Sequence, residues 1–385
     1  MATPKTITIL GGGVGGLVTA RELRKRLGKE HRIVLVDREA RHVFSPSFLW
    51  LMVGKRRPEQ VWRDLSRLSR KGIEVVHRDV TAIDPETRTV EVDGWSIESD
   101  YLVISLGADL KPDLVPGLAD AGHNLYTLEG ATEISESREG WKHGRLVVLV
   151  ASMPFKCPAA PYEAAMLLED DLRSRGVRDD FEVTLFSPEP GPMGVTGPEN
   201  SAAVREMVES RGIEYRPQHK VESVDPNART LRFEDGTEES FDHLVYIPPH
   251  VAPNVVVNAG LTGESGWVPV DRSSLQMSFE NVYAIGDITA IPLALGLHLP
   301  KAGTFALSQA RAVAKTIAAE VNEKGDPGVF NGHGECFIES GQGKAGIGAG
   351  NFYAEPKPTI KIRKPRRIWH WAKVWFEKRW FPKWA

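Results

Sequence analysis

Short apolar runs recur along the chain, and several of them end at a turn or an acidic residue. Runs of this length, rich in Val, Ile and Leu, predict strands buried on both faces, as in parallel sheets. Between them, LVTARELRKRL and YEAAMLLEDDLRSRG repeat apolar residues with helical spacing. The alternation of strand and helix predicts an α/β fold. The runs are ITIL, RIVLVD, YLVISLGA, RLVVLVA, FEVTLFS, DHLVYIP and NVYAIGDIT.

A glycine-rich loop follows the first apolar run. GGGVGG fits G-x-G-x-x-G at Gly11, Gly13 and Gly16, and the next run ends at Asp37, 21 residues beyond Gly16. In this context the glycines let the main chain approach a pyrophosphate at a helix N-terminus, and the acid accepts a hydrogen bond from a ribose hydroxyl. We therefore expect these residues and the adjacent Arg38 to bind a dinucleotide. A glycine-rich turn without a ligand is the alternative.

Two later motifs favour FAD over NAD as that dinucleotide. NVYAIGDIT joins an apolar strand to Gly286 and Asp287, and it resembles the second FAD motif of the disulfide-reductase superfamily. In that superfamily the aspartate contacts the ribityl chain of the flavin. YLVISLGA, which contains Gly107, resembles the strand and turn that close the first FAD segment. Each motif alone could be a buried strand ending in a turn, but their order and spacing predict FAD.

The segment after Ala108 has the strands of a second nucleotide-binding domain without its glycine loop. Three apolar runs and one helical pattern predict a second Rossmann-like domain over residues 109–248. The turn after its first strand reads SMPFKCPAAP, where side chains and prolines replace the bare main-chain N–H groups that a pyrophosphate needs. We expect no NAD(P)H site there. The FAD domain is predicted over 1–108 and 249–325, and a C-terminal segment over 326–385.

The chain has only two cysteines, Cys157 and Cys336, which are 179 positions apart. So few cysteines do not predict a disulfide-stapled secreted fold. Both lie in turn-rich segments beside the flavin motifs, although two unrelated inert thiols remain the alternative. His333 and Cys336 form H-x-x-C, but without a second pair of ligands they predict no metal site.

Three segments together resemble one family. FKCPAAPYE, GECFIESGQGKAG and PSFLWLMVG are similar to the sulfide:quinone oxidoreductase and flavocytochrome c sulfide dehydrogenase group, which has glutathione-reductase-type domains. The resemblance covers nearly the whole chain. It implies that Cys157 and Cys336 form a redox disulfide or a sulfur-bridged pair beside the flavin. It also implies that Glu163 exchanges protons there and that Lys301 lies at the N1/O2 edge of the flavin; for Glu163, a stabilising acid near a helix start is the alternative.

The sequence departs from this family at one position. Many members have a third cysteine upstream, and the corresponding region here, HNLYTLEGA, contains Tyr126 and no cysteine. Flavin attachment through that cysteine is therefore excluded. The length of the sulfur product and the nature of the sulfur donor stay open.

The C-terminal segment differs in charge from the rest of the chain. Net charge is −3, but residues 357–385 hold ten Lys or Arg and one acid, Glu377, together with five of the ten tryptophans. Interleaved basic and aromatic residues are typical of segments that lie in a membrane interface. Nucleic-acid binding, or packing of the tail on the protein or in a dimer, are the alternatives. No apolar run is long enough to span a bilayer.

The combined pattern predicts an enzyme that oxidises sulfide or a persulfide with FAD and passes electrons to membrane quinone. We expect a peripheral protein on the cytoplasmic face of the cell membrane, since Met1 leads almost directly into the first strand. A type II NADH:quinone oxidoreductase and a non-enzymatic, membrane-docked FAD protein are the alternatives. The oligomeric state is left open.

Overall fold

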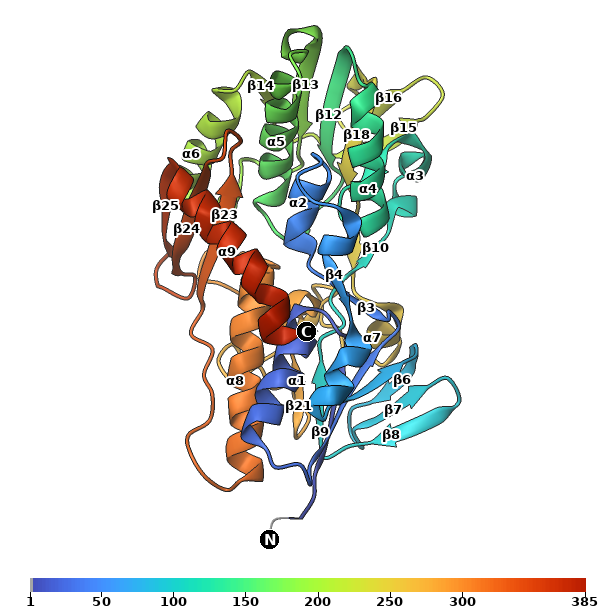
Figure 1. The fold of residues 1–385 in the computed structure, drawn as a ribbon, viewed down its shortest axis with the longest axis vertical. Helices are drawn as coiled ribbons and strands as arrows, with labels where there is room; N and C mark the ends of the chain where they lie inside the picture. The colour runs from blue at the N-terminus through green and yellow to red at the C-terminus, as the bar shows by residue number, and fades with distance from the viewer. Residues whose placement is uncertain (1–2) are drawn as a thin grey trace.

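A five-stranded parallel sheet forms the lower half of the molecule in the computed structural model, which describes residues 3–385 (Figure 1). Its strand order is β21-β9-β1-β2-β5, with Ile7 of β1 in register with Ile33 of β2 and Tyr101 of β9. Because β1 is the central strand, the glycine loop that follows it lies at the middle of the edge formed by the C-terminal ends of the strands. The strands are β1 (Thr6–Leu10), β2 (Arg32–Asp37), β5 (Glu74–His77), β9 (Tyr101–Ile104) and β21 (Val282–Ala284).

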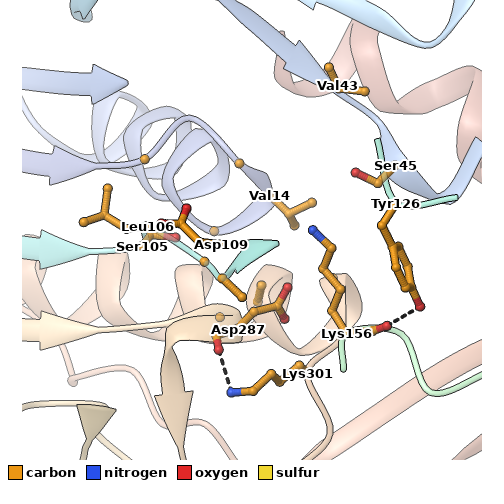
Figure 2. A pocket seen from close by; sticks show the side chains of 18 of the residues that line it. Val14, Val43, Ser45, Ser105, Leu106, Asp109, Tyr126, Lys156, Asp287 and Lys301 are labelled. Carbon is orange, nitrogen blue, oxygen red and sulfur yellow. Dashed lines mark hydrogen bonds between the residues drawn. The ribbon is translucent and has the colours of Figure 1, made fainter. Parts of the chain in front are cut away.

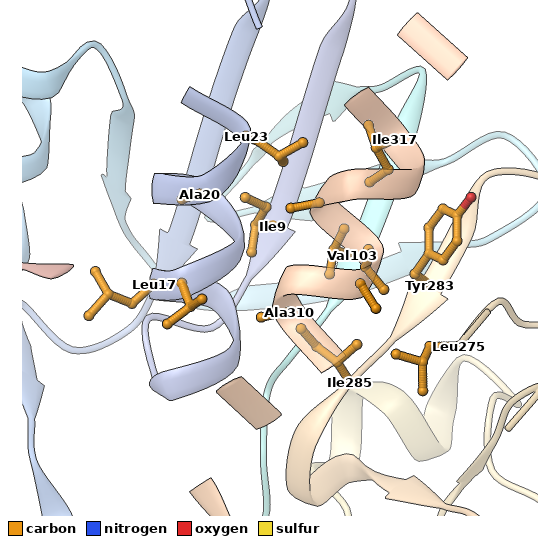
Figure 3. Packing of buried hydrophobic residues seen from close by; sticks show 14 of the residues in the cluster. Ile9, Leu17, Ala20, Leu23, Val103, Leu275, Tyr283, Ile285, Ala310 and Ile317 are labelled. Carbon is orange, nitrogen blue, oxygen red and sulfur yellow. The ribbon is translucent and has the colours of Figure 1, made fainter. Parts of the chain in front are cut away.

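Both faces of this sheet are covered. The helices α1 (Val14–Arg26) and α8 (Gly303–Val321) pack side by side on one face, where Leu17, Val103 and Ile317 share one buried cluster (Figure 3). A small antiparallel sheet of β6 (Val80–Asp84), β7 (Thr89–Val92) and β8 (Trp95–Glu98) covers the other face. Burial on both faces is the reason why these strands read as continuous apolar runs.

A second five-stranded parallel sheet forms the upper half, with strand order β11-β18-β12-β13-β14. Its strands are β11 (His123–Asn124), β12 (Gly144–Val150), β13 (Phe181–Phe186), β14 (Ile213–Arg216) and β18 (His243–Ile247). The helices α4 (Leu128–Ser137), α5 (Ala160–Ser174) and α6 (Pro198–Glu209) contribute to the core on one face. On the other face lie β15 (Val221–Asp225), β16 (Thr230–Phe233) and β17 (Glu238–Ser240).

The C-terminal residues form an antiparallel sheet and a long helix. The sheet contains β23 (His333–Glu339), β24 (Ala345–Asn351) and β25 (Thr359–Arg366), and Cys336 lies in β23. The helix α9 (Arg367–Trp384) crosses the front of the molecule from this sheet toward α1 (Figure 1). One face of α9 is buried through Val374, Trp380, Phe381 and Trp384.

The remaining elements are short connections. They are α2 (Phe48–Leu51), α3 (Leu118–Ala121), α7 (Asn254–Asn258), β3 (Arg41–Val43), β4 (Trp62–Asp64), β10 (Asp109–Leu110), β19 (His250–Val251), β20 (Val268–Pro269) and β22 (Thr289–Ala290). The α/β fold predicted from the apolar runs is confirmed. The two large sheets fall within the predicted ranges of the two domains, whose exact boundaries stay a prediction. Within residues 3–385, no helix combines the length and apolar character that crossing a membrane requires.

Candidate active site

The glycine loop forms one wall of a cleft of about 400 Å³ between the two sheets. Gly11 has φ +97°, and a Cβ there would collide with the main chain of Ser105, while a Cβ at Gly16 would collide with the carbonyl of Gly11. Gly13 faces open space at the start of α1, which has no side-chain cap. Uncapped N–H groups beside an open glycine are the arrangement that a pyrophosphate requires.

The acid at the end of β2 lies against this loop. The carboxylate of Asp37 accepts hydrogen bonds from the main-chain N–H of Gly12 and, at 2.6 Å, of Glu39. Burial raises the pKa of Asp37, although these two hydrogen bonds favour its charged form. Arg38 also lines the cleft, where its guanidinium forms a 3.0 Å salt bridge with Asp109.

His42, which the sequence did not single out, is buried and hydrogen-bonded to the glycine loop. Nδ1 of His42 donates to the carbonyl of Gly12 at 2.8 Å, because Nε2 is occupied in accepting from the indole N–H of Trp380, also at 2.8 Å. Burial lowers the pKa of His42 to about 4, so the ring is neutral and both hydrogen bonds are kept. The C-terminal helix thereby stabilises the glycine loop.

The second predicted motif follows β21, at the same sheet edge as the glycine loop. Gly286 has φ +78°, and its N–H donates to the side chain of Gln309 at 2.7 Å. Oδ1 of Asp287 is buried and has no hydrogen-bond partner among the described residues, and burial raises the pKa of this carboxyl. A buried polar atom without a partner is rare in folded proteins and fits a missing ligand hydroxyl. Gly107, with φ +70° and open space where a Cβ would point, lines the same cleft.

Lys301 lies in the wall of the cleft beneath Asp287. Its ammonium group donates to the main-chain carbonyls of Asp287 at 2.7 Å and Thr289 at 3.2 Å (Figure 2). It also lies 3.4 Å from the ring centroid of Trp267. Burial lowers the pKa of Lys301 to about 8. The predicted contact between Lys301 and the flavin stays a prediction.

A second lysine, not anticipated from the sequence, extends into the cleft. Lys156 precedes Cys157, and its side chain reaches across the cleft in the direction of Val14 (Figure 2). Burial lowers the pKa of Lys156, while Asp287 and Cys157 act in the opposite direction. The hydroxyl of Tyr126 donates to the carbonyl of Lys156 at 2.6 Å and so fixes this segment. A basic residue beside the predicted reactive thiol was the signal available in the sequence.

Cys157 lies at the edge of the cleft in a strained main-chain conformation. Its φ is +55°, which is rare for a residue with a side chain and occurs preferentially at functional sites. Two hydrogen bonds hold this conformation: the N–H of Cys157 donates to the carbonyl of Lys301 at 2.6 Å, and its carbonyl accepts from Ala160 at 2.9 Å. Through the first of these hydrogen bonds, the turn of Cys157 is joined directly to the segment of Lys301.

Cys336 lies opposite Cys157, and both are free thiols. The nearby thiol of Cys157, together with burial, raises the pKa of Cys336 well above its usual value, and the S–H of Cys336 donates to the carbonyl of Phe337 at 3.4 Å. The two cysteines that the sequence singled out are therefore neighbours in space. Their function as a redox pair stays a prediction.

Glu163 is buried in an ion pair next to the thiols. Oε1 of Glu163 accepts from the ammonium group of Lys373 at 2.6 Å and from the main-chain N–H of Glu339 at 2.8 Å. Burial raises the pKa of Glu163, and the ion pair with Lys373 opposes that effect. Glu163 in turn raises the pKa of Cys336, which places its charge within electrostatic reach of the thiols. His370 extends the chain of polar groups, with Nδ1 3.0 Å from the carboxylate of Glu339.

The acid that follows β13 in the upper sheet is already engaged in hydrogen bonding. After β13, Glu189 is buried and accepts from the hydroxyl of Tyr162 at 2.6 Å. Burial raises the pKa of Glu189 to about 7. An acid held in this way is not available to a ribose hydroxyl, which agrees with the replacement of the glycine loop by the Cys157 turn.

The fold and the cleft define a class of protein: a two-sheet dinucleotide flavoprotein with the thiol of Cys157 in the lining of its cleft. Residues 5–312 match the family model described as pyridine nucleotide-disulphide oxidoreductase, and the chain belongs to this family. The glycine loop, Asp37 and the unpartnered Oδ1 of Asp287 fit FAD, which is the cofactor of the family.

Relatives and solved structures resemble the chain over almost its full length. A sulfide-quinone reductase of Aquifex aeolicus is 29% identical, with 97% of this chain and 90% of the relative covered. The mitochondrial sulfide:quinone oxidoreductase of mouse is 25% identical, with 92% and 80% covered. The X-ray structure of the Aquifex aeolicus sulfide:quinone oxidoreductase superimposes with a TM-score of 0.88 at 27% identity, covering 98% of this chain and 91% of that one.

Proposed function

We propose that the protein is a sulfide:quinone oxidoreductase, which oxidises hydrosulfide at Cys157 and Cys336 and transfers two electrons to quinone. The observation that carries this proposal is the proximity of the two thiols, which come from segments 179 positions apart, together with the place of Cys157 in the lining of the FAD cleft. The names of the relatives support the same substrates. Bound FAD supplies the two-electron chemistry between sulfur and quinone.

The thiols supply the sulfur chemistry. In the oxidised enzyme, hydrosulfide attacks the sulfur of Cys157 in a Cys157–Cys336 disulfide, so that this S–S bond breaks and a new one forms. Cys157 then holds a persulfide and Cys336 leaves as a thiolate. The persulfide then loses its proton and the pair of thiols loses two electrons. As a result the outer sulfur of the persulfide bonds to the sulfur of Cys336, and a trisulfide bridge forms. Bound FAD would be the acceptor of this electron pair, and a further hydrosulfide can then attack the bridge.

The buried ion pair of Glu163 and Lys373 provides an acceptor for the persulfide proton. The carboxylate of Glu163 is kept charged by Lys373 and by the N–H of Glu339, while burial favours its protonated form. A carboxyl balanced in this way can accept the persulfide proton. The cationic groups of Lys156 and Lys301, on the walls of the cleft, favour negative charge developing there.

We also propose that α9 docks the protein on a membrane surface, as a quinone acceptor requires. Ile368, Trp371 and Trp375 form an exposed stripe on α9, with exposed fractions of 64%, 64% and 60%. Basic residues border this stripe, and the guanidinium of Arg379 stacks on Trp375 at 4.6 Å. Aromatic rings flanked by cations are typical of helices that lie in a membrane interface. The cytoplasmic face of the membrane and the oligomeric state stay predictions.

Turnover with sulfide and decylubiquinone tests the proposal. We expect reduction of decylubiquinone that depends on both sulfide and FAD, and that is lost in Cys157→Ser. NADH in place of sulfide should give no reduction, because the Cys157 turn lacks the glycine loop that binds a pyrophosphate and Glu189 is already hydrogen-bonded to Tyr162. Reduction by NADH would instead identify a type II NADH:quinone oxidoreductase. A flavin that responds to neither donor would identify a non-enzymatic FAD protein.

A further inference from the structure

A second cavity, of about 420 Å³, lies between the 3-10 helix of residues 65–71 and the C-terminal end of α9. It is separate from the FAD cleft and shares no residue with it. Four cations line it, Arg63, Arg67, Arg70 and Lys71, and its apolar side is formed by Phe381 and Pro382.

The four cations form no salt bridge with an Asp or Glu side chain or with the carboxylate of Ala385 among the residues that the structure describes. The pKa of Asp64 is nevertheless lowered by its hydrogen bonds with Ser66 and also by the charge of Arg67. The guanidinium of Arg63 stacks on the ring of Phe381 at 4.5 Å and donates to the carbonyl of Trp62 at 2.6 Å. The neighbouring acid, Asp64, is occupied in capping the 3-10 helix through the N–H of Ser66.

Such a cluster is complementary to an anion with several oxygens. Like charges around one cavity repel one another, and a phosphate group relieves this repulsion through charge-assisted hydrogen bonds. Arg67, Arg70 and Lys71 are exposed, so their head groups can close on a ligand, whereas the apolar side formed by Phe381 and Pro382 accommodates carbon atoms.

The position of the cavity on α9 identifies the source of the phosphate. Pro382 follows Trp375 by seven residues and Trp371 by eleven, so all three lie on one face of the helix. The cavity therefore opens beside the exposed stripe of Ile368, Trp371 and Trp375. If the stripe lies among lipid acyl chains, the cavity lies at the depth of the headgroups.

Cations also surround the other side of the end of α9. Lys25 and Lys383 each lie 4.8 Å from the ring centroid of Trp384, and Arg311 lies 5.6 Å from it. Burial, followed by the charges of Arg311 and Lys25, lowers the pKa of Lys383. The end of α9 thus combines two groups of cations with one exposed aromatic stripe, as expected for a surface that meets anionic lipid.

We propose that the cavity binds the phosphate headgroup of an anionic phospholipid. This proposal rests on the membrane docking proposed above. It assigns the binding of the phosphate to four cations that lie outside the basic C-terminal segment.

Vesicle binding by four forms of the FAD-loaded protein tests it. These are wild type, Arg67→Gln/Arg70→Gln at the site, Trp371→Ser/Trp375→Ser in the stripe, and Lys315→Gln/Lys324→Gln as control. The control removes the same charge at exposed positions of the α8 region, where neither lysine forms a salt bridge within residues 3–385. Affinity is measured for vesicles of phosphatidylcholine alone and with phosphatidylglycerol or cardiolipin added.

We expect the site variant to bind anionic vesicles about 30-fold more weakly than wild type, since each cation at such a surface strengthens binding about fivefold. It should bind neutral vesicles as wild type does, and the control should match wild type on all vesicles. Equal losses in the site variant and the control would overturn the proposal in favour of diffuse attraction. Wild-type affinity in the site variant would also overturn it.

Two further results distinguish failure of the lipid site from failure of the membrane docking on which it rests. Binding of wild type to no vesicle would overturn both the docking and the lipid site. Tight binding of soluble glycerol phosphate without vesicles, lost in the site variant, would overturn a lipid as the source of the phosphate. Loss of all vesicle binding in the stripe variant, together with the selective loss in the site variant, supports both proposals.

Discussion

The ammonium group of Lys373 in α9 lies 2.6 Å from Oε1 of Glu163 in α5, although 210 positions separate the two residues. Both side chains are almost fully buried, with exposed fractions of 8% and 2%. Through this ion pair, the C-terminal helix provides the counter-charge of Glu163, the acid next to the thiols. The helix is therefore part of the candidate active site as well as the candidate membrane contact.

Replacement of Lys373 by Met should destabilise the protein by about 3 kcal/mol or more, because it leaves a buried carboxylate without its partner. Chemical denaturation measures the free energy of unfolding. The double variant Glu163→Gln/Lys373→Met should recover much of the loss, while Lys378→Met, at an exposed position of the same helix, should cost about 0.5 kcal/mol or less. A Lys373→Met protein as stable as wild type would contradict the ion pair.

Replacement of Glu163 by Gln should slow flavin reduction by sulfide about 100-fold, the effect expected when a general base is lost. Stopped-flow absorbance of the FAD-loaded protein measures this rate. The FAD content should not change, because Glu163 lies outside the residues that line the FAD cleft. An unchanged rate would show that another group accepts the proton.

Acid should destabilise the protein through His42. The folded protein keeps this ring neutral down to about pH 4, whereas in the unfolded chain it takes up a proton near pH 6.5. The unfolded state therefore binds more protons in this window, and stability falls as the pH falls, by about 2 kcal/mol between pH 8 and pH 5. In His42→Gln the loss measured by denaturation over this range should be smaller by about that amount. Equal pH dependence in the two proteins would contradict the neutral, buried ring.

The exposed stripe of α9 should control membrane binding without affecting the fold. Trp371→Ser/Trp375→Ser should bind vesicles at least about tenfold more weakly, since burial of a large apolar side chain contributes roughly 1.5–3 kcal/mol. Its melting temperature should stay close to that of wild type. Trp95→Ser, at a position 42% exposed in β8, is the matched control and should bind as wild type does. A stripe variant that binds vesicles normally would exclude α9 as the anchor.

Local patterns were enough to predict much of the fold and the cofactor. The apolar runs and the glycine loop are signals carried by neighbouring residues, and the structure has strands and a cleft at those places. The turn of Cys157 was also visible, because prolines and side chains occupy the place of the usual glycines. Its positive φ could not be read from the sequence, since the contact with Lys301 that holds it comes from a distant segment.

Long-range contacts account for what the sequence could not predict. His42 and Trp380 are 338 positions apart, and neither residue carries a local signal of their hydrogen bond. For the aromatic residues of the C-terminal segment, the sequence favours a membrane-interface segment and leaves a tail packed on the protein as the alternative. In the structure they divide between two faces of α9: Trp380 and Trp384 are buried in the core, and Trp371 and Trp375 are exposed. The alternative of a tail packed on the protein therefore holds for one face of the helix.

Anaerobic titration of the FAD-loaded protein with sulfide, in wild type and in Cys336→Ser, tests most directly that the two thiols pass electrons to the flavin. In wild type, sulfide should bleach the flavin absorbance, and decylubiquinone should restore it. In Cys336→Ser, with FAD content unchanged, the rate of bleaching should fall by at least about 100-fold, because the thiolate that closes the trisulfide bridge is lost. Bleaching of the Cys336→Ser flavin at the wild-type rate would contradict the proposed function of the pair.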